Sequence, residues 1–488
     1  MMKVSSIGKK ISLLVATLVM SALVLVPGVR SAHAAEINEP IITSASVAST
    51  PLYSVAGATV KLTMDFQLPN NIIHEGDTST LTLPSGFTFA WTMDFNVEDN
   101  SGNVVARGHA NTTNRTLVLT YTNYPETHSD IRGSIEAAMR REDETSNDYG
   151  MKTLTINDGN HTVNVNGQVD YRQWTGDNPN ERLAKWTTID PVNKQIIYHV
   201  RVNAHGDNLS NVVLEDTLST PDARYAGPTP SGDEMISIQR GTFARDAVGN
   251  FYITNELASN SPEITAARAS IAVNAQRNHF TINLGNLGTD GVVLTYAVVF
   301  GHEPVQSEAI NNDVKITYGT PGQEESYHSR VMWQTVSGRA NGYNYTIGIK
   351  KTDKNGNALK GAEFTVTRDR SGEVVGTVTT DDNGEATING LLRDDYTITE
   401  TKAPEGYTVA APVKINGAQF DRSSLSAYVN VEDEKVPTSP VPPTEVSTKP
   451  KKKQQLSNTG SDVTALITGV AITASIALAV LVTRKKLA

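Results

Sequence analysis

Two histidine-glutamate pairs, His74-Glu75 and His302-Glu303, are the first places where side-chain types suggest chemistry, because each begins like the helix of a zinc protease. Such a helix needs a second histidine at the fifth position, so that both imidazoles reach one metal ion from the same face. Neither pair has that histidine, and Pro304 would break a helix at the second pair. The sequence also contains no G-x-S-x-G and no G-x-x-x-x-G-K word. We therefore expect no enzyme, no metal site and no cofactor.

Two aspartate-rich words carry oxygen atoms that could hint at calcium, Asp353-Lys354-Asn355-Gly356 and Asp381-Asp382-Asn383-Gly384. The remaining ligands of a calcium loop are missing from both. Asp, Asn and Gly are also the residues that tight turns require. We interpret both words as turns between strands.

The elements that must position any site are predicted to be mostly strands, because short alternating runs rich in Thr, Val and Asn, together with 36 Gly, favour strands and turns over helices. The length of 488 residues leaves room for about three domains. A break at WTGDNPNE, residues 174–181, separates two larger β-rich blocks, 36–172 and 182–336. The stretch 130–142 has apolar residues at helix-like spacing, but Gly133 and its strand-like surroundings favour a strand and a loop.

The N-terminal end of the chain predicts export across the membrane, and the C-terminal end predicts retention at the cell surface. Lysines precede an apolar run from Ile11 to Val26, and Ala32-His33-Ala34 supplies a cleavage site, so residues 1–35 are predicted to be a signal peptide. An uncleaved anchor is the alternative. At the other end, 436–455 is Pro-rich and reads as an extended spacer, or else as a disordered tail. An uncharged stretch, 463–482, then precedes a basic end at 484–486, as in a membrane span.

Charge and cysteine content exclude further classes of protein. The net charge is −10 with no basic stripe, which argues against nucleic acid as a partner. An exported chain usually relies on disulfides for reinforcement, yet this one has no cysteine. Any covalent bracing must therefore come from other side chains.

Residues 345–435 closely resemble the B-type repeat of Gram-positive collagen adhesins, which also occurs in pilins. The resemblance rests on IKKTDKNGNALKGAEFTV, TDDNGEATINGL and YTITETKAPEGYTV. It implies a small β-sandwich in which a lysine condenses with an Asn or Asp, assisted by a buried glutamate, to form an intramolecular isopeptide bond. By position these residues are Lys351, Asp433 and Glu400. Burial would favour a neutral amine and a neutral acid that can shuttle protons.

Two alternatives to this assignment stay open. Asn430 is a rival acceptor, although along an extended strand Asn430 and Asp433 face opposite sides and only one can point inward. An ordinary buried salt bridge is the other alternative.

The two larger blocks resemble the paired immunoglobulin-like (DEv-IgG) ligand-binding region of the collagen and fibrinogen adhesins called MSCRAMMs. The resemblance rests on residues 61–89, 119–126 and 196–218. In that family the two domains clamp a ligand, and a C-terminal extension then crosses back to add a strand to the first domain. The resemblance implies a latch in 337–344, with Ser337, Gly338, Arg339, Ala340, Asn341 and Gly342, and a latch seat with Thr120, Tyr121, Thr122 and Tyr124. A plain linker is the alternative.

The resemblance also implies a second isopeptide bond, in the second block. Lys185, Asp216 and Asn312 match the family order of lysine, acid and asparagine, with ammonia as the leaving group. Lys194 and Asn311 are close competitors. Such a bond would favour the collagen-binding branch of the family.

LSNTG, residues 456–460, resembles the L-P-x-T-G sorting signal that the transpeptidase sortase cuts after Thr. The cut would fall between Thr459 and Gly460, and residues 456–488 would be the sorting region. The resemblance implies covalent attachment to peptidoglycan, with membrane contact only before sorting. Ser457 stands where the family has Pro, which leaves the class of sortase open. A permanent tail anchor is the alternative.

Together these features predict an all-β, surface-exposed adhesin of a Gram-positive cell wall that binds collagen or another extracellular-matrix protein. Tyr171, Arg172 and Trp174 are candidate ligand contacts, because a groove for a collagen rod needs aromatic and polar groups. The same residues could equally belong to the core or contact the latch. The alternatives are binding of fibrinogen or another peptide, and a pilin or pilus-tip subunit. A shaft pilin would carry a Y-P-K-like word, but Tyr124-Pro125-Glu126 lacks the lysine.

Overall fold

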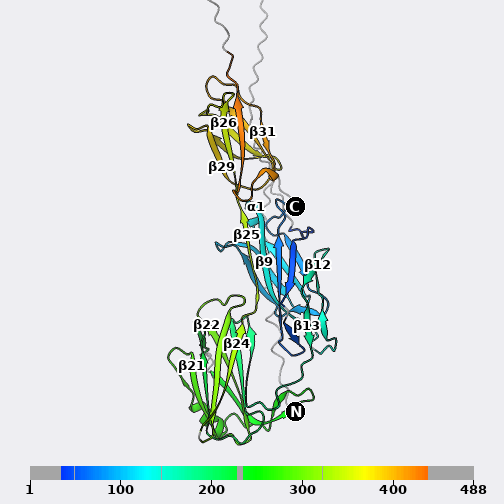
Figure 1. Ribbon diagram of the computed structural model, residues 1–488, viewed down its shortest axis with the longest axis vertical. Coiled ribbons are helices and arrows are strands. Elements are labelled where there is room, and N and C mark those ends of the chain that lie inside the picture. Colours follow the sequence, from blue (N-terminus) through cyan, green and yellow to red (C-terminus); the bar gives the residue numbers. More distant parts are fainter. Residues whose placement is uncertain (1–33, 49, 144, 228–234, 321, 438–488) are drawn as a thin grey trace, which may run out of the picture. The chain divides into compact units, whose positions relative to one another are not determined.

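The computed structural model describes residues 34–437, except 49, 144, 228–234 and 321 (Figure 1). The apolar run of the predicted signal peptide, nearly all of the spacer, LSNTG and the predicted span lie outside the described residues. Within them the fold is almost entirely β, as predicted, with two short α-helices, α1 (Tyr124–Thr127) and α2 (Pro262–Ala269). Neither of these described helices has the length and apolar character needed to cross a membrane.

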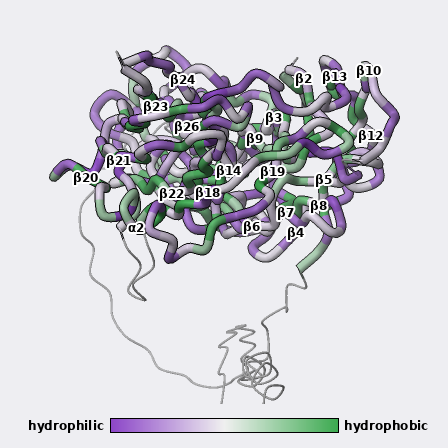
Figure 2. The backbone as a smooth tube through the Cα atoms, turned by 90° about the horizontal axis from the view of Figure 1, so that it is seen from below, coloured by the Kyte–Doolittle hydropathy of each residue, from purple (hydrophilic) through white to green (hydrophobic). Residues whose placement is uncertain are grey.

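Side chains alternate between the core and the surface along the strands, which is why these sequences form half-buried sheets. In β3 (Val60–Gln67) the residues at every second position are buried, and β23 (Ala309–Tyr318) repeats this pattern over its whole length. Figure 2 shows the same alternation as hydrophobic and hydrophilic residues mixed along the strands. The buried residues form a separate hydrophobic cluster in each of three domains.

The first domain is an immunoglobulin-like sandwich. Its strands are β1 (Ile42–Val47), β2 (Pro51–Tyr53), β3, β4 (Thr78–Thr82), β5 (Phe87–Phe89), β6 (Met93–Glu98), β7 (Val104–Asn111), β8 (Thr116–Tyr121), β9 (Ser129–Arg141), β10 (Gly150–Lys152), β11 (Thr155–Asp158), β12 (His161–Asn166) and β13 (Val169–Arg172). The main sheet runs β6-β7-β8-β4-β11-β12-β1-β3-β9-β5. The stretch 130–142 was predicted to be a strand and a loop; the strand is confirmed, but β9 continues to Arg141 and leaves no loop there.

The second domain is also a two-layer sandwich. Its strands are β14 (Leu183–Asp190), β15 (Gln195–Val202), β16 (Val212–Leu218), β17 (Ala223–Tyr225), β18 (Ile236–Arg245), β19 (Phe251–Thr254), β20 (Ala272–Val273), β21 (His279–Gly285), β22 (Gly291–Phe300), β23 and β24 (Gln323–Met332). One sheet has the order β14-β15-β22-β18-β19, and the other β20-β21-β16-β23-β24. Helix α2 was not predicted, although Ser261 caps it and Pro262 starts it, both common helix-start signals.

A single strand, β25 (Val336–Tyr343), leaves the second domain and joins the first. It pairs with β6 in parallel and with β9 in antiparallel orientation, so it joins strands near opposite ends of the first domain's sheet path. Figure 1 shows β25 beside β9, although the two are about two hundred residues apart in sequence. Val336 and Ala340 are buried in the hydrophobic cluster of the first domain. β25 is therefore part of that domain's core.

The third domain begins at Tyr345 and has two small sheets, β29-β26-β32 and β28-β27-β30-β31. Its strands are β26 (Tyr345–Asp353), β27 (Glu363–Arg368), β28 (Glu373–Thr379), β29 (Glu385–Leu391), β30 (Tyr396–Lys402), β31 (Val413–Ile415) and β32 (Ser426–Asp433). The first strand, β26, pairs in parallel with the last strand, β32.

The two aspartate words of this domain are turns, as predicted. Asp353 accepts hydrogen bonds from the backbone N–H groups of Asn355 and Asn357, at 2.8 and 2.9 Å. Asp381 accepts the N–H groups of Asn383 and Glu385, at 2.9 and 2.8 Å. Each carboxylate therefore stabilises its own turn.

Candidate functional site

The third domain brings Lys351, Glu400 and Asp433 together in its interior. Lys351 lies on β26, Asp433 on the neighbouring β32 and Glu400 on β30 of the facing sheet. The ammonium of Lys351 is 3.0 Å from Oε2 of Glu400 and contacts Oδ1 of Asp433. The ring of Phe364 covers the amine from one side, with 5.7 Å between Nζ and the ring centre. A lysine is thus held against two carboxyl groups out of contact with water.

One of these carboxyl groups is favoured in its protonated form. Burial raises the pKa of Glu400, and a hydrogen bond to Asp433 raises it further, against the opposing effects of the Ala410 N–H and Lys351. Oε1 of Glu400 and Oδ2 of Asp433 are buried and lack a hydrogen-bond donor among the described residues. A proton shared between the two acids would satisfy both oxygens. Glu400 is therefore suited to carry a proton.

The rival acceptor Asn430 lies on the exposed face of β32, whereas Asp433 points inward. The alternation along the strand separates the two, as the sequence indicated. The structure therefore places Asp433, and not Asn430, beside Lys351.

The second domain has a second buried lysine. Lys185 on β14 donates to Oδ2 of Asp216 on β16, at 2.7 Å. Asn312 on β23 is fully buried, and its Nδ2 donates to the Tyr296 hydroxyl at 3.2 Å. Tyr296 in turn bonds to the carboxylate of Asp216, so it connects Asn312 with the partner of Lys185. Strand β14 belongs to one sheet and β23 to the other, so a bond between Lys185 and Asn312 would join the two layers of the sandwich.

Three tyrosines that the sequence reasoning missed form the walls of this cluster, Tyr198, Tyr225 and Tyr296. Tyr225 donates to Oδ1 of Asp216 at 2.8 Å, and Tyr296 donates to Oδ2 at 2.6 Å. The ring of Tyr198 lies 4.9 Å from the Lys185 amine. Burial lowers the pKa of Lys185, and Asp216 opposes this shift only in part, which favours the neutral, nucleophilic amine. The alternation of apolar residues along β15 and β22 indicated that Tyr198 and Tyr296 are buried, but it did not indicate that they lie beside a lysine.

The two competitors lie elsewhere. Lys194 is exposed in the turn after β14 and pairs with Glu303. Asn311 is adjacent to Asn312 on β23 and therefore faces the opposite side of the sheet, where its N–H donates to Thr220 at 2.7 Å.

The segment predicted as a latch, Ser337 to Gly342, lies within β25, but its neighbours differ from the prediction. Thr120 and Tyr121 belong to β8, which pairs with β4 and β7 and not with β25. Thr122 bonds backward to β7 residues. Tyr124 of the predicted seat does contact the segment, because its hydroxyl accepts the N–H of Gly342 at 3.2 Å. The strand is seated on β6 and β9 instead.

Glycines allow this close approach. A Cβ atom at Gly133 of β9 would lie 2.2 Å from the carbonyl oxygen of Arg339, and one at Gly338 of β25 would lie 2.7 Å from the side chain of Val97. Gly342 is similarly close to Ile131 and His128. The absence of side chains at these points lets three strands pack edge to edge.

A cavity of about 820 Å³ lies beside β25. Its walls come from β6 and β9 of the first domain, from two loops of the second domain, and from β25 itself. Phe95, Val192 and Val305 supply apolar surface. Charged groups line it as well, namely Asp94, Glu98, Glu136, Glu303, Lys194 and Arg339. A molecule bound there would touch both immunoglobulin-like domains and the strand that connects them.

The predicted ligand contacts do not line this cavity. Tyr171 is 1% exposed and belongs to the core of the first domain, which is one of the alternatives that the sequence left open. Arg172 pairs with Asp170, and the indole N–H of Trp174 donates to Asn250 of the second domain at 2.6 Å. Phe95, Val192 and Val305, which do line it, carry no sequence motif that would have identified them.

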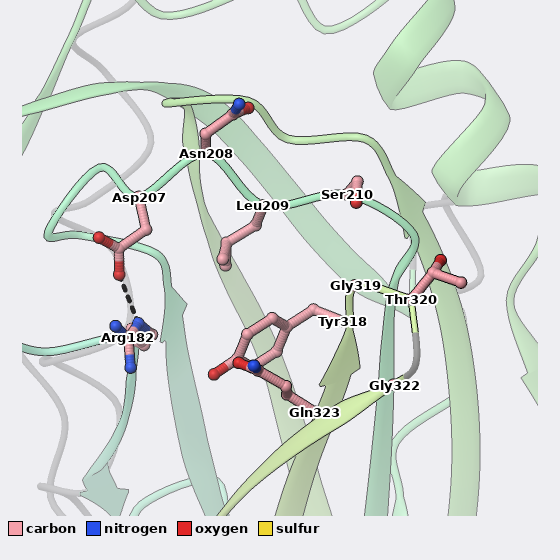
Figure 3. A pocket seen from close by; sticks show the side chains of 10 residues that line it. All are labelled: Arg182, Asp207, Asn208, Leu209, Ser210, Tyr318, Gly319, Thr320, Gly322 and Gln323. Atoms are coloured by element: carbon pink, nitrogen blue, oxygen red, sulfur yellow. Dashed lines mark hydrogen bonds and ion pairs between the residues drawn. The ribbon is translucent and has the colours of Figure 1, made fainter.

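A smaller pocket of about 370 Å³ lies at one end of the second domain (Figure 3). Its cationic group, Arg182, forms ion pairs with Asp207 and Glu325. The two carboxylates neutralise the guanidinium, so the pocket offers no unpaired positive charge for recognition there.

Comparison with known proteins agrees with this domain order. Residues 55–148 match the family described as bacterial Ig domain, and residues 345–434 match the prealbumin-like fold domain, SpaA. Serine-aspartate repeat-containing protein C of Staphylococcus aureus is 23% identical over 385 residues, which cover 74% of this chain. Serine-aspartate repeat-containing protein I of Staphylococcus saprophyticus is 22% identical over 395 residues. The chain spans 38% of the length of the first relative and 19% of the second.

Solved structures of adhesins are also similar. The collagen adhesin CNA of S. aureus has a TM-score of 0.44 at 15% identity, covering 64% of this chain and 99% of that one. The collagen-binding domain of the Erysipelothrix rhusiopathiae surface protein RspB has a TM-score of 0.46 at 14% identity, with 62% and 98% covered. The Enterococcus faecalis MSCRAMM ACE has a TM-score of 0.44 at 14% identity, with 62% and 98% covered.

The chain therefore contains a segment similar to bacterial Ig domains and a segment similar to prealbumin-like SpaA domains, and most of its length is similar to serine-aspartate repeat-containing proteins.

Proposed function

We propose that the chain binds native collagen in the cavity beside β25, and that β25 acts as a latch that closes over the ligand. The observation that carries this proposal is the origin of the cavity walls, since residues of both immunoglobulin-like domains and of β25 line one space. Residues 36–172 and 182–336 would form the clamp, and 337–344 the latch. A ligand held there resists dissociation as long as β25 remains paired with β6 and β9.

The lining suits a collagen rod in its chemistry. A triple helix presents a repeating surface of ring methylenes, backbone carbonyls and both signs of charge, and the cavity offers apolar walls with acidic and basic groups. Val192 and Val305 are 66% and 63% exposed, so they are available to a partner. Fibrinogen or another extended peptide would need the same latch and is the competing ligand.

Two intramolecular isopeptide bonds would stiffen this clamp and its stalk. In the third domain, 345–435, Nζ of Lys351 attacks Cγ of Asp433, a carbon-nitrogen bond forms, and water leaves with protons moved by Glu400. In the second domain, Lys185 attacks Asn312 with Asp216 as proton carrier, and ammonia leaves. Such bonds do not reduce, which suits an exported chain without cysteine.

The chain would act from the cell wall. Residues 436–455 would space the domains from the wall, and 456–488 would direct sortase to join Thr459 to peptidoglycan. Release of the chain from cell walls by a muralytic enzyme, and not by detergent, would be expected. A Thr459→Ala variant that stays equally wall-bound would contradict sortase anchoring.

The binding proposal is tested with the purified chain against three surfaces: native collagen, heat-denatured collagen and fibrinogen. We expect tight, slowly dissociating binding to native collagen alone. Val305→Arg, which places a charge in the cavity, should weaken that binding by about tenfold or more. Val374→Arg is the matched control, because Val374 is 56% exposed but lies in the third domain.

The outcomes separate the candidates. Binding to fibrinogen but not to collagen would replace the ligand and keep the cavity. Binding to collagen that Val305→Arg and Val374→Arg affect equally would place the ligand on another surface.

A further inference from the structure

The buried cluster of the second domain contains an unbroken chain of hydrogen bonds from nucleophile to leaving group. Nζ of Lys185 and the hydroxyl of Tyr296 both contact the same oxygen, Oδ2 of Asp216, at 2.7 and 2.6 Å. The Tyr296 hydroxyl in turn accepts a hydrogen bond from Nδ2 of Asn312 at 3.2 Å. Each of these four residues is buried, so water does not compete for the contacts.

The contacts of Asn312 are unequal in an informative way. Its amide nitrogen is engaged by Tyr296, whereas its carbonyl oxygen is buried and has no hydrogen-bond partner among the described residues. The nitrogen is the atom that must leave as ammonia when Lys185 is joined to Asn312. A departing amide nitrogen needs a proton, since amide anions are very poor leaving groups.

We propose that Tyr296 is a catalytic residue of this cross-linking reaction, which relays a proton from Asp216 to the amide nitrogen that leaves Asn312. The inference rests on the Lys185–Asn312 bond proposed above. The third domain, where water leaves from Asp433, has no tyrosine hydroxyl in the corresponding contacts of Lys351, Glu400 and Asp433 within the described residues.

The relay balances in atoms and charge. Nζ of Lys185 bonds to Cγ of Asn312 and gives a proton to Oδ2 of Asp216. Once Cγ is tetrahedral, Nδ2 is no longer conjugated and becomes basic, so it can take the Tyr296 proton. Tyr296 recovers a proton from Asp216, the Cγ–Nδ2 bond breaks, and ammonia leaves. Nothing is oxidised or reduced, and both carriers return to their starting states.

Two neighbouring tyrosines provide matched controls for the loss of a hydroxyl. Tyr198 lies against the same lysine, but its hydroxyl is buried without a hydrogen-bond partner among the described residues. Tyr225 donates to the other oxygen of Asp216, and its hydroxyl contacts the backbone of Asn278 and not Asn312. Tyr198→Phe therefore removes a hydroxyl that has no hydrogen-bond partner among the described residues. Tyr225→Phe removes a hydrogen bond to Asp216 and the contact with Asn278. Tyr296→Phe removes the hydroxyl that connects Asp216 with the leaving nitrogen of Asn312.

The test follows cross-linking in the full chain during cell-free synthesis. Samples are quenched in acid and denaturant and digested, and the joined peptide carrying Lys185 and Asn312 is quantified by mass spectrometry. It should be one ammonia lighter than its two parts. We expect Tyr296→Phe to slow its appearance by about a hundredfold or more. Tyr198→Phe should stay close to the unmodified chain, and Tyr225→Phe should fall between the two.

Each outcome decides between the two proposals. If the unmodified chain never forms the joined peptide, the bond itself is absent and the relay falls with it. If the bond forms and Tyr296→Phe forms it at an unchanged rate, the bond stands and the relay is wrong. Equal slowing by Tyr225→Phe and Tyr296→Phe would also overturn the relay, because the effect would then act through Asp216 alone.

Folding of the variant is monitored inside the same molecule. Cross-linking of Lys351 in the third domain reports on synthesis and folding of that domain, and protease resistance reports on the second. If Tyr296→Phe does not fold, 3-fluorotyrosine at 296 keeps the shape and makes the phenol more acidic. The relay predicts a changed rate for it, and an unchanged rate would count against the relay.

Discussion

The hydroxyl of Tyr345 donates a hydrogen bond to the carboxylate of Asp130, with 2.5 Å between the two oxygens. Tyr345 is the first residue of the third domain, only two residues after β25 ends, and Asp130 lies on β9, one of the strands that β25 pairs with. Arg422 and Arg393 of the third domain approach the same carboxylate, at 2.9 and 3.5 Å. Asp130 of the first domain therefore binds the start of the third domain, directly after the end of β25, and so holds the C-terminal end of β25 against the first domain.

Removing the charge of Asp130 should loosen β25. Asn is the suitable replacement, because Asp130 has a φ of 53°, which Asn tolerates better than most residues. We expect Asp130→Asn to lose about 1.5–3 kcal/mol of local stability, since charged hydrogen bonds to Arg422 and Tyr345 are weakened. Hydrogen exchange of β25 amides should then accelerate by about tenfold or more. Asp382→Asn, which alters an exposed pair with Lys360, is the control.

The same contact should be sensitive to acid. Burial raises the pKa of Asp130, but hydrogen bonds from Tyr345 and Asn70 and the charges of Arg422 and Arg393 outweigh burial and lower it below 3.8. A lowered pKa adds stability that is fully present above 3.8 and is lost as pH falls through the folded-state value. Protection of the β25 amides, measured relative to the intrinsic exchange rate at each pH, should therefore decrease in that range in the unmodified chain. In Asp130→Asn this particular pH dependence should be absent, and its persistence would assign it to other carboxylates.

Sequence alone predicted a large part of the fold for a local reason. Buried and exposed residues alternate along each strand, so a strand was expected even within 130–142, despite Gly133, although the loop also expected there is part of β9. The partners of β25 could not be predicted in this way, because pairing with β6 and β9 depends on contacts across about two hundred residues. The Asp130 contact is hidden for the same reason.

Some site residues could likewise be identified from the sequence, and others could not. Lys351, Glu400 and Asp433 were identified by resemblance, and the structure brings them into contact. Tyr296 could not be identified, because a buried tyrosine on an alternating strand looks like any core residue until Asp216 and Asn312 are seen on either side of its hydroxyl. Tyr171 shows the limit of residue type alone, since an aromatic residue that could suit either a ligand groove or the core is in the core.

Substitution of Lys351 tests the bond proposed for the third domain. The unmodified chain should yield a joined peptide of Lys351 and Asp433 that is one water lighter than its parts, and Lys351→Ala should not. The bond closes a loop of 82 residues, so by the chain-entropy argument its loss should cost about 4 kcal/mol of third-domain stability. Lys350→Ala, at an exposed neighbour paired with Glu385, should change neither property.

A further variant separates this bond from a salt bridge. Asp433→Asn keeps an acceptor carbonyl but changes the leaving group, so the joined peptide should now be one ammonia lighter than its parts. If Lys351 and Asp433 form only a buried ion pair, the unmodified chain and the Asp433→Asn variant would both keep their full sequence mass. In that case the third domain would be held by electrostatics alone.

Gly133 gives the sharpest test of how β25 is seated. An alanine Cβ at this position would lie 2.2 Å from a backbone oxygen of β25, the carbonyl of Arg339, and backbone cannot move aside as a side chain can. Gly133→Ala should therefore expose β25 and accelerate its amide exchange. If the chain binds collagen as proposed, the variant should also release collagen faster. Gly338→Ala should do less, because its closest contact is the side chain of Val97. Ser337→Ala, on β25 itself, adds no atoms and is the control. If the β25 amides exchange at the same rate in all three variants as in the unmodified chain, β25 does not approach Gly133 in solution as closely as it does here.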